Sequence, residues 1–341
     1  MSDAPLKVTA MDVARLAGVS QSAVSRVFTP GASASKRTAE RVRAAAEQLG
    51  YRPDPLARAM ITGRTRIIGL VVAYLENQFY PMALERLSRA LQQRGYHILV
   101  FMAENSTEKV AEVVQELIDY RVDGIITASV SISNDLTARL TAQGIPVVNF
   151  NRGQDDPALT DVTSDNVAGA RQATEFLISG GHRRIAHIQG WQGSSTGRDR
   201  ALGFDQAMKA AGLAPVAQID GMYDRDTAAK TAHALCACPD RPDALFVGND
   251  HMAFAVMDAL RFDLGLRVPE DVSVIGYDDV PMAAWPAYGL TTIRQPVGRM
   301  VAATVEALLG LIDGTAPPRK TLIDGPLMVR SSARIPEGWT P

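Results

Sequence analysis

Polar side chains end several short apolar runs of the chain, and their types suit the binding of a small hydroxylated molecule. Asn151 and Arg152 end the run VVNFNR, Asn249 ends FVGN, and Asp278 ends VIGYD. Arg198 opens the segment RDRALGF. A guanidinium group and a carboxylate can each hold two oxygen atoms at once, so Arg198 and Asp278 fit a pair of neighbouring hydroxyl groups. For Arg152, an ion pair with a nearby acid is an equally good interpretation.

Aromatic side chains could form the walls of such a site, because aromatic rings pack against the apolar faces of a sugar ring. Phe79 and Trp285 are the candidates, and Tyr80 is expected behind them. Asp250 and Asp279 also follow apolar runs. For these two aspartates we favour helix N-capping over contact with the bound molecule.

Other chemistries find no support in the sequence. It has no Ser-His-Asp order and no phosphate-cradling GxxxxGK segment, and its five histidines are scattered without metal-ligand spacing. His182 and His187 flank an apolar run and are expected to be structural. Cys236 and Cys238 have no second pair, so we expect small, buried or half-buried residues of a reducing compartment. We therefore expect no enzyme activity, no catalytic or metal-binding residues and no cofactor.

The elements that must position the polar residues begin at Ile67. From there, short β-branched runs such as IIGLVVA, HILVFMA and GIITASV alternate with amphipathic segments such as MALERLSRALQQRG. This alternation predicts parallel βαβ units. A second series of the same kind follows, and the two join near residues 160–166. We expect two similar lobes with a cleft between them, lined by residues at the carboxyl ends of the strands.

A different pattern occupies the N-terminal part of the chain. The segment MDVARLAGVSQSAVSRVF predicts two short amphipathic helices interrupted by Gly-Val-Ser. Gly18 can adopt the left-handed conformation that closes a helix, Ser20 is a favourable N-cap for the next one, and Val19 is an apolar plug between them. This arrangement is typical of a helix-turn-helix, whose second helix enters the major groove of DNA. The alternative is an αα-hairpin inside some other helical domain.

The charge distribution favours the helix-turn-helix. Residues 1–66 contain eleven lysines and arginines and five acidic residues, a net charge of +6, whereas the remainder holds 24 basic and 32 acidic residues. A basic N-terminal part joined to an acidic remainder indicates a polyanionic partner for the N-terminal part alone.

The polar side chains of the N-terminal motif can be divided by the DNA contact that each suits. Arg26, on the second helix, suits bidentate hydrogen bonds to O6 and N7 of a guanine. Thr9, Ser20, Ser25 and Lys36 are expected at phosphates, which position the helix without reading sequence. For Ser25, a solvent-facing hydroxyl is an equally good interpretation.

The segments VTAMDVARLAGVSQSAVSRVF and RVRAAAEQLGYRPDPLARAM resemble the DNA-binding headpiece and hinge of the lactose-repressor (LacI/GalR) family of bacterial transcription regulators. The resemblance continues in order through IIGLVVAYLENQFY, VTSDNVAGARQATEFLISGGHRRIAHIQG, RDRALGFDQAM, ALFVGNDHMAF, VPEDVSVIGYDDV and LTTIRQPVGRM. It covers essentially residues 8–335.

The resemblance implies an all-α helix-turn-helix headpiece followed by an α/β core like a periplasmic binding protein, with two Rossmann-type lobes. The implied ranges are 1–50 for the headpiece, 51–66 for a hinge linker with a short minor-groove helix, and 67–341 for an effector-binding and dimerisation core. Lobe one would hold about 67–163 and 293–322, and lobe two about 164–292 and 323–341.

The resemblance also implies roles for single residues in the DNA-binding part. Gln21 and Ser22 occupy the family's base-reading positions. In the hinge, Ala57 and Arg58 would line the minor groove, and Met60 stands where a leucine normally wedges into a base step. The alternative is a linker that makes no DNA contact, which describes the free protein well because an isolated helical turn does not persist.

In the core, the resemblance places Arg198 and Asp278 where family members grip hydroxyls or polar edges of an effector. Asn151 departs from the pattern, since many relatives have an aspartate there. This loss of a carboxylate weakens any inference to a particular sugar.

Together these features predict a sequence-specific transcription regulator, a repressor, whose operator binding is controlled allosterically by a sugar or sugar derivative in the cleft. A homodimer on a palindromic operator is expected. The segment MVRSSARIPEGWTP lacks the leucine heptads of a tetramerising coiled coil, which favours a dimer. Linkage permits an effector that either releases DNA or strengthens binding.

Two rival classes are a nutrient-uptake receptor and an enzyme of sugar metabolism. The receptor would need an export signal, and MSDAPLKVTA has no apolar signal core. No stretch approaches the length of a membrane span, so no membrane partner and a cytoplasmic location, at the nucleoid when DNA is bound, are expected.

Overall fold

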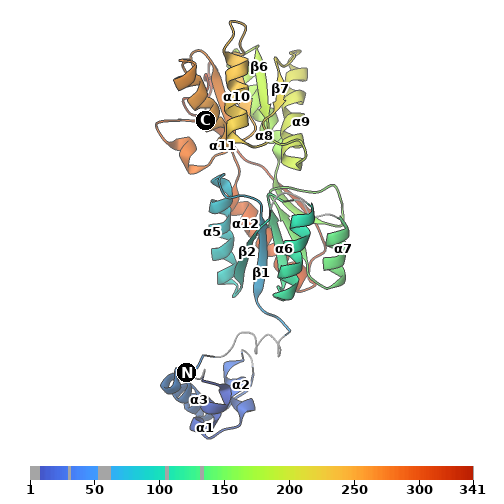
Figure 1. Cartoon of the computed structure of the whole chain (residues 1–341), viewed down its shortest axis with the longest axis vertical. Coiled ribbons are helices and arrows are strands. Elements are labelled where there is room, and N and C mark those ends of the chain that lie inside the picture. The colour runs from blue at the N-terminus through green and yellow to red at the C-terminus, as the bar shows by residue number, and fades with distance from the viewer. Residues whose placement is uncertain (1–7, 30–31, 53–62, 104–106, 131–133, 341) are drawn as a thin grey trace, which may run out of the picture. The chain divides into compact units, whose positions relative to one another are not determined.

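The computed structural model describes residues 8–29, 32–52, 63–103, 107–130 and 134–340, and it divides the chain into two compact units. The first unit comprises residues 1–66 and the second comprises residues 67–341 (Figure 1). None of the helices in the described ranges has the length and apolar character that crossing a bilayer requires.

The first unit contains α1 (Ala10–Ala17), α2 (Gln21–Phe28) and α3 (Lys36–Leu49). Val13, Val24 and Val42, one from each helix, are almost fully buried and form the centre of its small core. Gly18 ends α1 at φ 60°, in the left-handed region that favours glycine, as the sequence predicts. Arg41 of α3 donates to the carbonyl oxygen of Ala17 at 2.5 Å, which ties the end of α1 to α3.

The second unit contains two mainly parallel sheets, each forming the centre of one lobe. In the first sheet the strand order is β11-β5-β4-β3-β1-β2, and in the second it is β12-β10-β9-β8-β6-β7. Every strand pair is parallel except β10 with β12, which is antiparallel. The strands of lobe one are β1 (Ile67–Val72), β2 (His97–Met102), β3 (Gly124–Ala128), β4 (Val147–Phe150), β5 (Thr160–Ser164) and β11 (Lys320–Ile323). The strands of lobe two are β6 (Ile185–Gln189), β7 (Gln218–Asp220), β8 (Ala244–Val247), β9 (Ser273–Asp278), β10 (Thr291–Arg294) and β12 (Leu327–Met328).

Helices cover the sheets, as the alternating pattern predicts (Figure 1). Those of lobe one are α5 (Phe79–Gln93), α6 (Thr107–Asp119), α7 (Asn134–Ala142) and α12 (Val297–Ile312). Those of lobe two are α8 (Asn166–Ser179), α9 (Ser195–Ala210), α10 (Arg225–Cys236) and α11 (Asp250–Asp258), followed by a π-helical turn (Ala259–Asp263) and, further on, a 3-10 turn (Pro281–Ala284).

The described chain passes between the lobes after β5, after β10 and after β11. All three passages differ slightly from the expected lobe boundaries. Residue 164 belongs to lobe one, because β5 continues to Ser164. Residues 293 and 294 belong to lobe two, because β10 continues to Arg294 alongside β9. Ile323 belongs to lobe one, because it pairs with Ser164 of β5. These passages bring the carboxyl ends of both sheets to the junction of the lobes, where the polar residues lie.

Candidate functional site

The second helix of the headpiece presents a polar surface, as the helix-turn-helix interpretation requires. The hydroxyl of Ser20 accepts a hydrogen bond from the backbone N–H of Ala23 at 3.2 Å, so Ser20 caps α2. Gln21, Ser22 and Arg26 are exposed. This exposure leaves three polar side chains of α2 able to reach an external partner.

The residues expected at phosphates differ in solvent exposure and in the hydrogen bonds that they already make. Lys36, in the first turn of α3, is exposed. The hydroxyl of Thr9 already donates to the carboxylate of Asp12 at 2.7 Å within a capping box at the start of α1. Ser25 is half-buried, and its backbone carbonyl accepts from the hydroxyl of Thr29. Of the remaining predicted DNA contacts, Ala57, Arg58 and Met60 lie outside the described residues.

In the core, polar residues of both lobes converge on one small cavity. It is lined by Tyr74, Asn77, Tyr80, Asn151, Arg152, Thr196, Arg200, Tyr223, Asn249 and Asp278. These ten residues are called the inter-lobe cavity below. Its free space is about 10 Å³, room for about one water molecule. The lobes are therefore closed on one another, and a sugar-sized molecule needs them to separate before it enters.

Asp278 lines this cavity and is 2% exposed. Its carboxylate accepts hydrogen bonds from Asn77 at 3.0 Å and from Gln295 at 2.7 Å, and it lies 3.6 Å from the guanidinium of Arg200. Burial raises the pKa of Asp278, while the positive charge of Arg200 acts in the opposite direction. Asn77 comes from lobe one and Asp278 from lobe two, so this bond joins the lobes directly.

Arg200 is as deeply buried as Asp278, and hydrogen bonds fix its side chain. It is 2% exposed, and it donates to the side chain of Asn166 at 2.9 Å and to the carbonyl oxygen of Gly248 at 2.5 Å. Its guanidinium lies over the ring of Tyr277 at 3.7 Å from the centroid. These contacts orient the guanidinium beside Asp278, so the pair presents fixed donors and acceptors.

Asn151 and Arg152 bring donors and acceptors from lobe one. Asn151 donates to the hydroxyl of Tyr80 at 3.2 Å, and its side-chain oxygen has no partner. Arg152 donates to the carbonyl oxygen of Ser129 at 2.6 Å, and its Nε is unpartnered. No carboxylate of the described residues lies within ion-pair distance of Arg152, so the structure does not contain the alternative ion pair. Its guanidinium instead lies 5.7 Å from the ring centroid of Trp191.

Three of the residues predicted to bind the effector do not line the inter-lobe cavity. Phe79 is fully buried and stacks on Phe150 in the core of lobe one, so it does not line the cavity. Trp285 is 51% exposed and lies outside the cavity. Arg198 is 48% exposed in its side chain and lies 3.8 Å from the carboxylate of Asp155.

The error at Arg198 has a simple geometric cause. Residues two apart on a helix point in nearly opposite directions, since each residue advances by about 100°. Arg200 therefore faces the cavity while Arg198 faces solvent. The spacing that buries Gly203 and Phe204 also buries Arg200, and this signal was available in the sequence.

Four further residues line the cavity and were not predicted from the sequence, namely Tyr74, Asn77, Thr196 and Tyr223. Tyr74 follows β1 at its carboxyl end, where inspection of every strand end would have found it. Burial raises the pKa of Tyr74 well above its usual value of 10, so its hydroxyl stays neutral and able to donate. Thr196 and Tyr223 bond to each other at 3.0 Å, from α9 and from the loop before α10.

The predicted helix-capping roles of Asp250 and Asp279 are wrong. Asn249 caps α11 by accepting from the N–H of Met252, and Asp250 accepts from Thr292 at 2.6 Å and from the N–H of Val280 at 2.9 Å. Burial, reinforced by the negative charge of Asp278, raises the pKa of Asp250 to about 8. Asp279 instead pairs with two arginines described below.

His187, Cys236 and Cys238 do not line the inter-lobe cavity. His187 is fully buried between Phe204 and Phe246, and burial lowers its pKa to about 3. Cys236 is buried, which raises the pKa of its thiol to about 11, whereas Cys238 is exposed. In the described ranges no group of histidine, cysteine, aspartate or glutamate side chains could hold a metal ion.

Comparisons with known proteins agree with this geometry. Residues 9–54 match the family model described as bacterial regulatory proteins, lacI family, and residues 174–333 match a periplasmic binding protein-like domain. A transcriptional repressor named PurR from Photobacterium profundum is 33% identical over 96% of this chain and 98% of its own length. A PurR from Pectobacterium carotovorum is also 33% identical, over 94% of this chain and 98% of its own.

Solved structures of transcription regulators are also similar to this chain. The lac repressor dimer bound to operator and the anti-inducer ONPF has a TM-score of 0.87 and 28% identity, covering 95% of this chain and 98% of that one. The transcriptional regulator CelR in complex with cellobiose has a TM-score of 0.72 and 32% identity, covering 96% and 100%.

The helix-turn-helix joined to a two-lobed α/β core defines a DNA-binding transcription regulator rather than an enzyme. The chain belongs to the lacI family of bacterial regulatory proteins, and it is a transcriptional repressor. This confirms the family, the fold class and the absence of an enzymatic role that the sequence predicts.

Proposed function

We propose that this repressor binds a sugar or sugar derivative in the inter-lobe cavity and that this ligand controls its operator affinity. The observation that carries the proposal is the Asp278–Arg200 pair, buried and fixed at the carboxyl ends of the strands. Neutral tyrosine hydroxyls and the free side-chain oxygen of Asn151 surround it. Such a set of donors and acceptors matches several hydroxyl groups on one small molecule.

The ligands of similar solved structures support this ligand class. CelR was solved with cellobiose. A periplasmic binding protein/LacI transcriptional regulator from Alkaliphilus metalliredigens was solved with D-xylulofuranose, and it is 26% identical with a TM-score of 0.72. Both ligands are sugars. The description of the PurR relatives names no ligand.

Control of DNA binding would follow from the contacts that join the lobes. In the closed core Asn77 bonds to Asp278, and the N–H of Gly153 donates to the hydroxyl of Ser195 at 3.0 Å. A ligand that replaces these bonds shifts the balance between open and closed lobes by its differential affinity for the two states. The two hinge segments of a dimer would then change their spacing, with Ala57, Arg58 and Met60 fitting the minor groove in one state only.

We also propose that the repressor is a homodimer. β2 is an edge strand of the lobe-one sheet, and it exposes Val100 by 39% and Met102 by 51%. An exposed apolar edge strand favours pairing with another surface, and a second copy would cover it on both molecules at once. The lac repressor structure named above is a dimer on its operator.

A ligand screen tests the proposed effector class. We expect at least one sugar or sugar acid to raise the melting temperature of the full chain in a thermal-shift panel. The same compound should change operator affinity in an electrophoretic shift assay. A panel in which no sugar shifts melting, or in which the stabilising sugars leave operator affinity unchanged, would contradict the proposal.

For the headpiece, we propose that Gln21, Ser22 and Arg26 read bases while Thr9, Ser20, Ser25 and Lys36 contact phosphates. The substitution Arg26→Ala should cost about 1–3 kcal/mol on the selected operator and flatten the preference at one base pair. The measurement is fluorescence anisotropy on an operator obtained by selection from random DNA, repeated with the variant.

Lys36→Ala is the matched comparison, because loss of a phosphate contact weakens binding to all sequences about equally. Arg26→Ala is expected to change which sequences are selected, and Lys36→Ala is not. An unchanged selected sequence for Arg26→Ala would remove Arg26 from base reading.

A further inference from the structure

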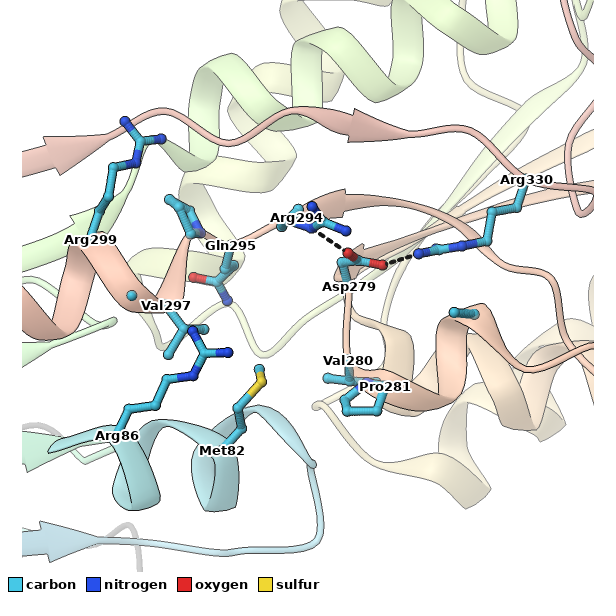
Figure 2. A pocket seen from close by; sticks show the side chains of 13 residues that line it. Met82, Arg86, Asp279, Val280, Pro281, Arg294, Gln295, Val297, Arg299 and Arg330 are labelled. Carbon is cyan, nitrogen blue, oxygen red and sulfur yellow. Dashed lines mark hydrogen bonds and ion pairs between the residues drawn. The ribbon is translucent and has the colours of Figure 1, made fainter. Parts of the chain in front are cut away.

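A second cavity, larger than the inter-lobe cavity, opens at the junction of α5, the carboxyl end of β9 and the start of α12. Its volume is about 510 Å³. Figure 2 shows Met82 and Arg86 reaching into it from α5, with Asp279, Arg294 and Arg330 on the opposite side. We call it the arginine cavity, after the lining residues Arg86, Arg294, Arg299 and Arg330.

Positive charge in the arginine cavity exceeds negative charge. Asp279 is its single lining carboxylate among the described residues, and it is shared by Arg294 at 2.6 Å and Arg330 at 2.5 Å (Figure 2). Arg299 donates to the backbone oxygen of Asp324 and has no acid partner in the described ranges. Arg86 also forms no ion pair with any described acid. Two guanidinium groups on the wall therefore lack a compensating anion.

A buried amide supplies an independent indication of a ligand. Gln295 lines the cavity and is 3% exposed. Its amide nitrogen donates to Asp278 at 2.7 Å, and its side-chain oxygen has no hydrogen-bond partner. An acceptor buried without a donor is costly, so the free oxygen favours a bound group that donates a hydrogen bond.

The start of α12 adds to the attraction for an anion. Pro296 precedes α12 and offers no side-chain cap. The N–H groups of Val297 and Arg299 donate to the backbone oxygens of Gln295 and Pro296, so within the first turn the N–H of Gly298 is the one for which the described residues supply no acceptor. A helix of this length carries partial positive charge at its N-terminus. A Cβ built on Gly298 would lie 3.5 Å from the guanidinium of Arg86, so this arginine lies against the first turn of the helix.

We propose that the arginine cavity is a second ligand site, distinct from the inter-lobe cavity, for a small anion that also carries a hydroxyl group. A phosphorylated or carboxylated polyol meets both conditions. Its anionic oxygens are bound by Arg86, Arg299 and the start of α12, and its hydroxyl donates to the free oxygen of Gln295. The cavity volume is sufficient for a molecule of several carbon atoms.

Gln295 connects this site to Asp278, because it lines the arginine cavity and its amide nitrogen donates to the carboxylate of Asp278. A ligand that holds the Gln295 oxygen also fixes the amide that bonds Asp278. The second site does not depend on the identity of the effector proposed above, since the residues proposed to contact its ligand do not line the inter-lobe cavity.

The test uses isothermal titration calorimetry on the full chain with three probes. We expect glycerol 3-phosphate, which has hydroxyls and a dianionic group, to bind more tightly than sulfate, which has no hydroxyl. Glycerol is expected not to bind. Arg86→Ala should weaken glycerol 3-phosphate by at least about tenfold, because a charge-assisted hydrogen bond is lost.

Two variants test whether the effect is specific to the arginine cavity. Arg89→Ala removes an exposed arginine of the same helix that pairs with Glu85, and Arg152→Gln changes the inter-lobe cavity instead. Both should bind glycerol 3-phosphate as the unchanged chain does. The proposal is overturned if glycerol 3-phosphate does not bind at millimolar concentration, or if either control weakens it as much as Arg86→Ala. It is equally overturned if Arg86→Ala alters only the oligomeric state in sedimentation.

Discussion

Replacing Asp278 by asparagine is expected to raise the sugar concentration that gives a half-maximal change in operator affinity by about 100-fold. Asp278 is the one carboxylate that lines the inter-lobe cavity within the described residues. Asparagine keeps the shape but removes the charge, so charge-assisted bonds to ligand hydroxyls are lost, at about 3 kcal/mol for two of them. Alanine is a poorer choice, because Asp278 has φ 128°, where asparagine is better tolerated.

The measurement is a titration of the sugar identified by the thermal-shift panel into the repressor–operator complex. Asp155→Asn is the matched control, since Asp155 is an exposed aspartate of the same core that lines neither cavity. It should leave the titration unchanged, and Asp278→Asn should still bind operator without sugar. An unchanged half-maximal concentration in Asp278→Asn would mean that the sugar does not contact this carboxylate.

The parts of the fold predicted correctly are those specified by local signals. Gly18 and Ser20 end and begin helices through bonds within a few residues of themselves, and the structure shows both caps. The strands with continuous apolar runs were found for the same reason. β5 reads TDVTS and was missed, because its polar residues become buried only through pairing with β4 and β11.

The candidate site was predicted less completely, because it is assembled from distant parts of the chain. Asn77 is significant only through its bond to Asp278, 201 residues away, and no local pattern indicates that pairing. Phe79 was misplaced for a related reason. The sequence indicates an aromatic pair at Phe79 and Tyr80, but the direction in which α5 begins decides that Tyr80 faces the cavity and Phe79 the core.

The second large effect is expected at Arg200. The substitution Arg200→Met should lower the free energy of unfolding of the core by about 3–5 kcal/mol, because it leaves a buried carboxylate without its cation. It also leaves the side-chain oxygen of Asn166 and the carbonyl of Gly248 without their donor. Urea denaturation followed by circular dichroism measures the change, and the sugar response of the variant should be lost as well.

Arg198→Met is the matched control on the same helix. The Arg198 side chain is 48% exposed and its ion pair with Asp155 is solvated, so its replacement should change stability by no more than about 0.5 kcal/mol. Equal effects of the two substitutions would mean that α9 does not turn Arg200 toward the cavity.

A double variant separates the loss of the ion pair from a general loss of packing. If the cost of Arg200→Met comes from the unpaired charge of Asp278, adding Asp278→Asn removes that charge and restores part of the stability. The combined cost is then smaller than the sum of the two single costs, by an interaction energy of about 1–3 kcal/mol. Strictly additive costs would mean that Arg200 stabilises the core through packing against Tyr277, at 3.7 Å, rather than through its charge.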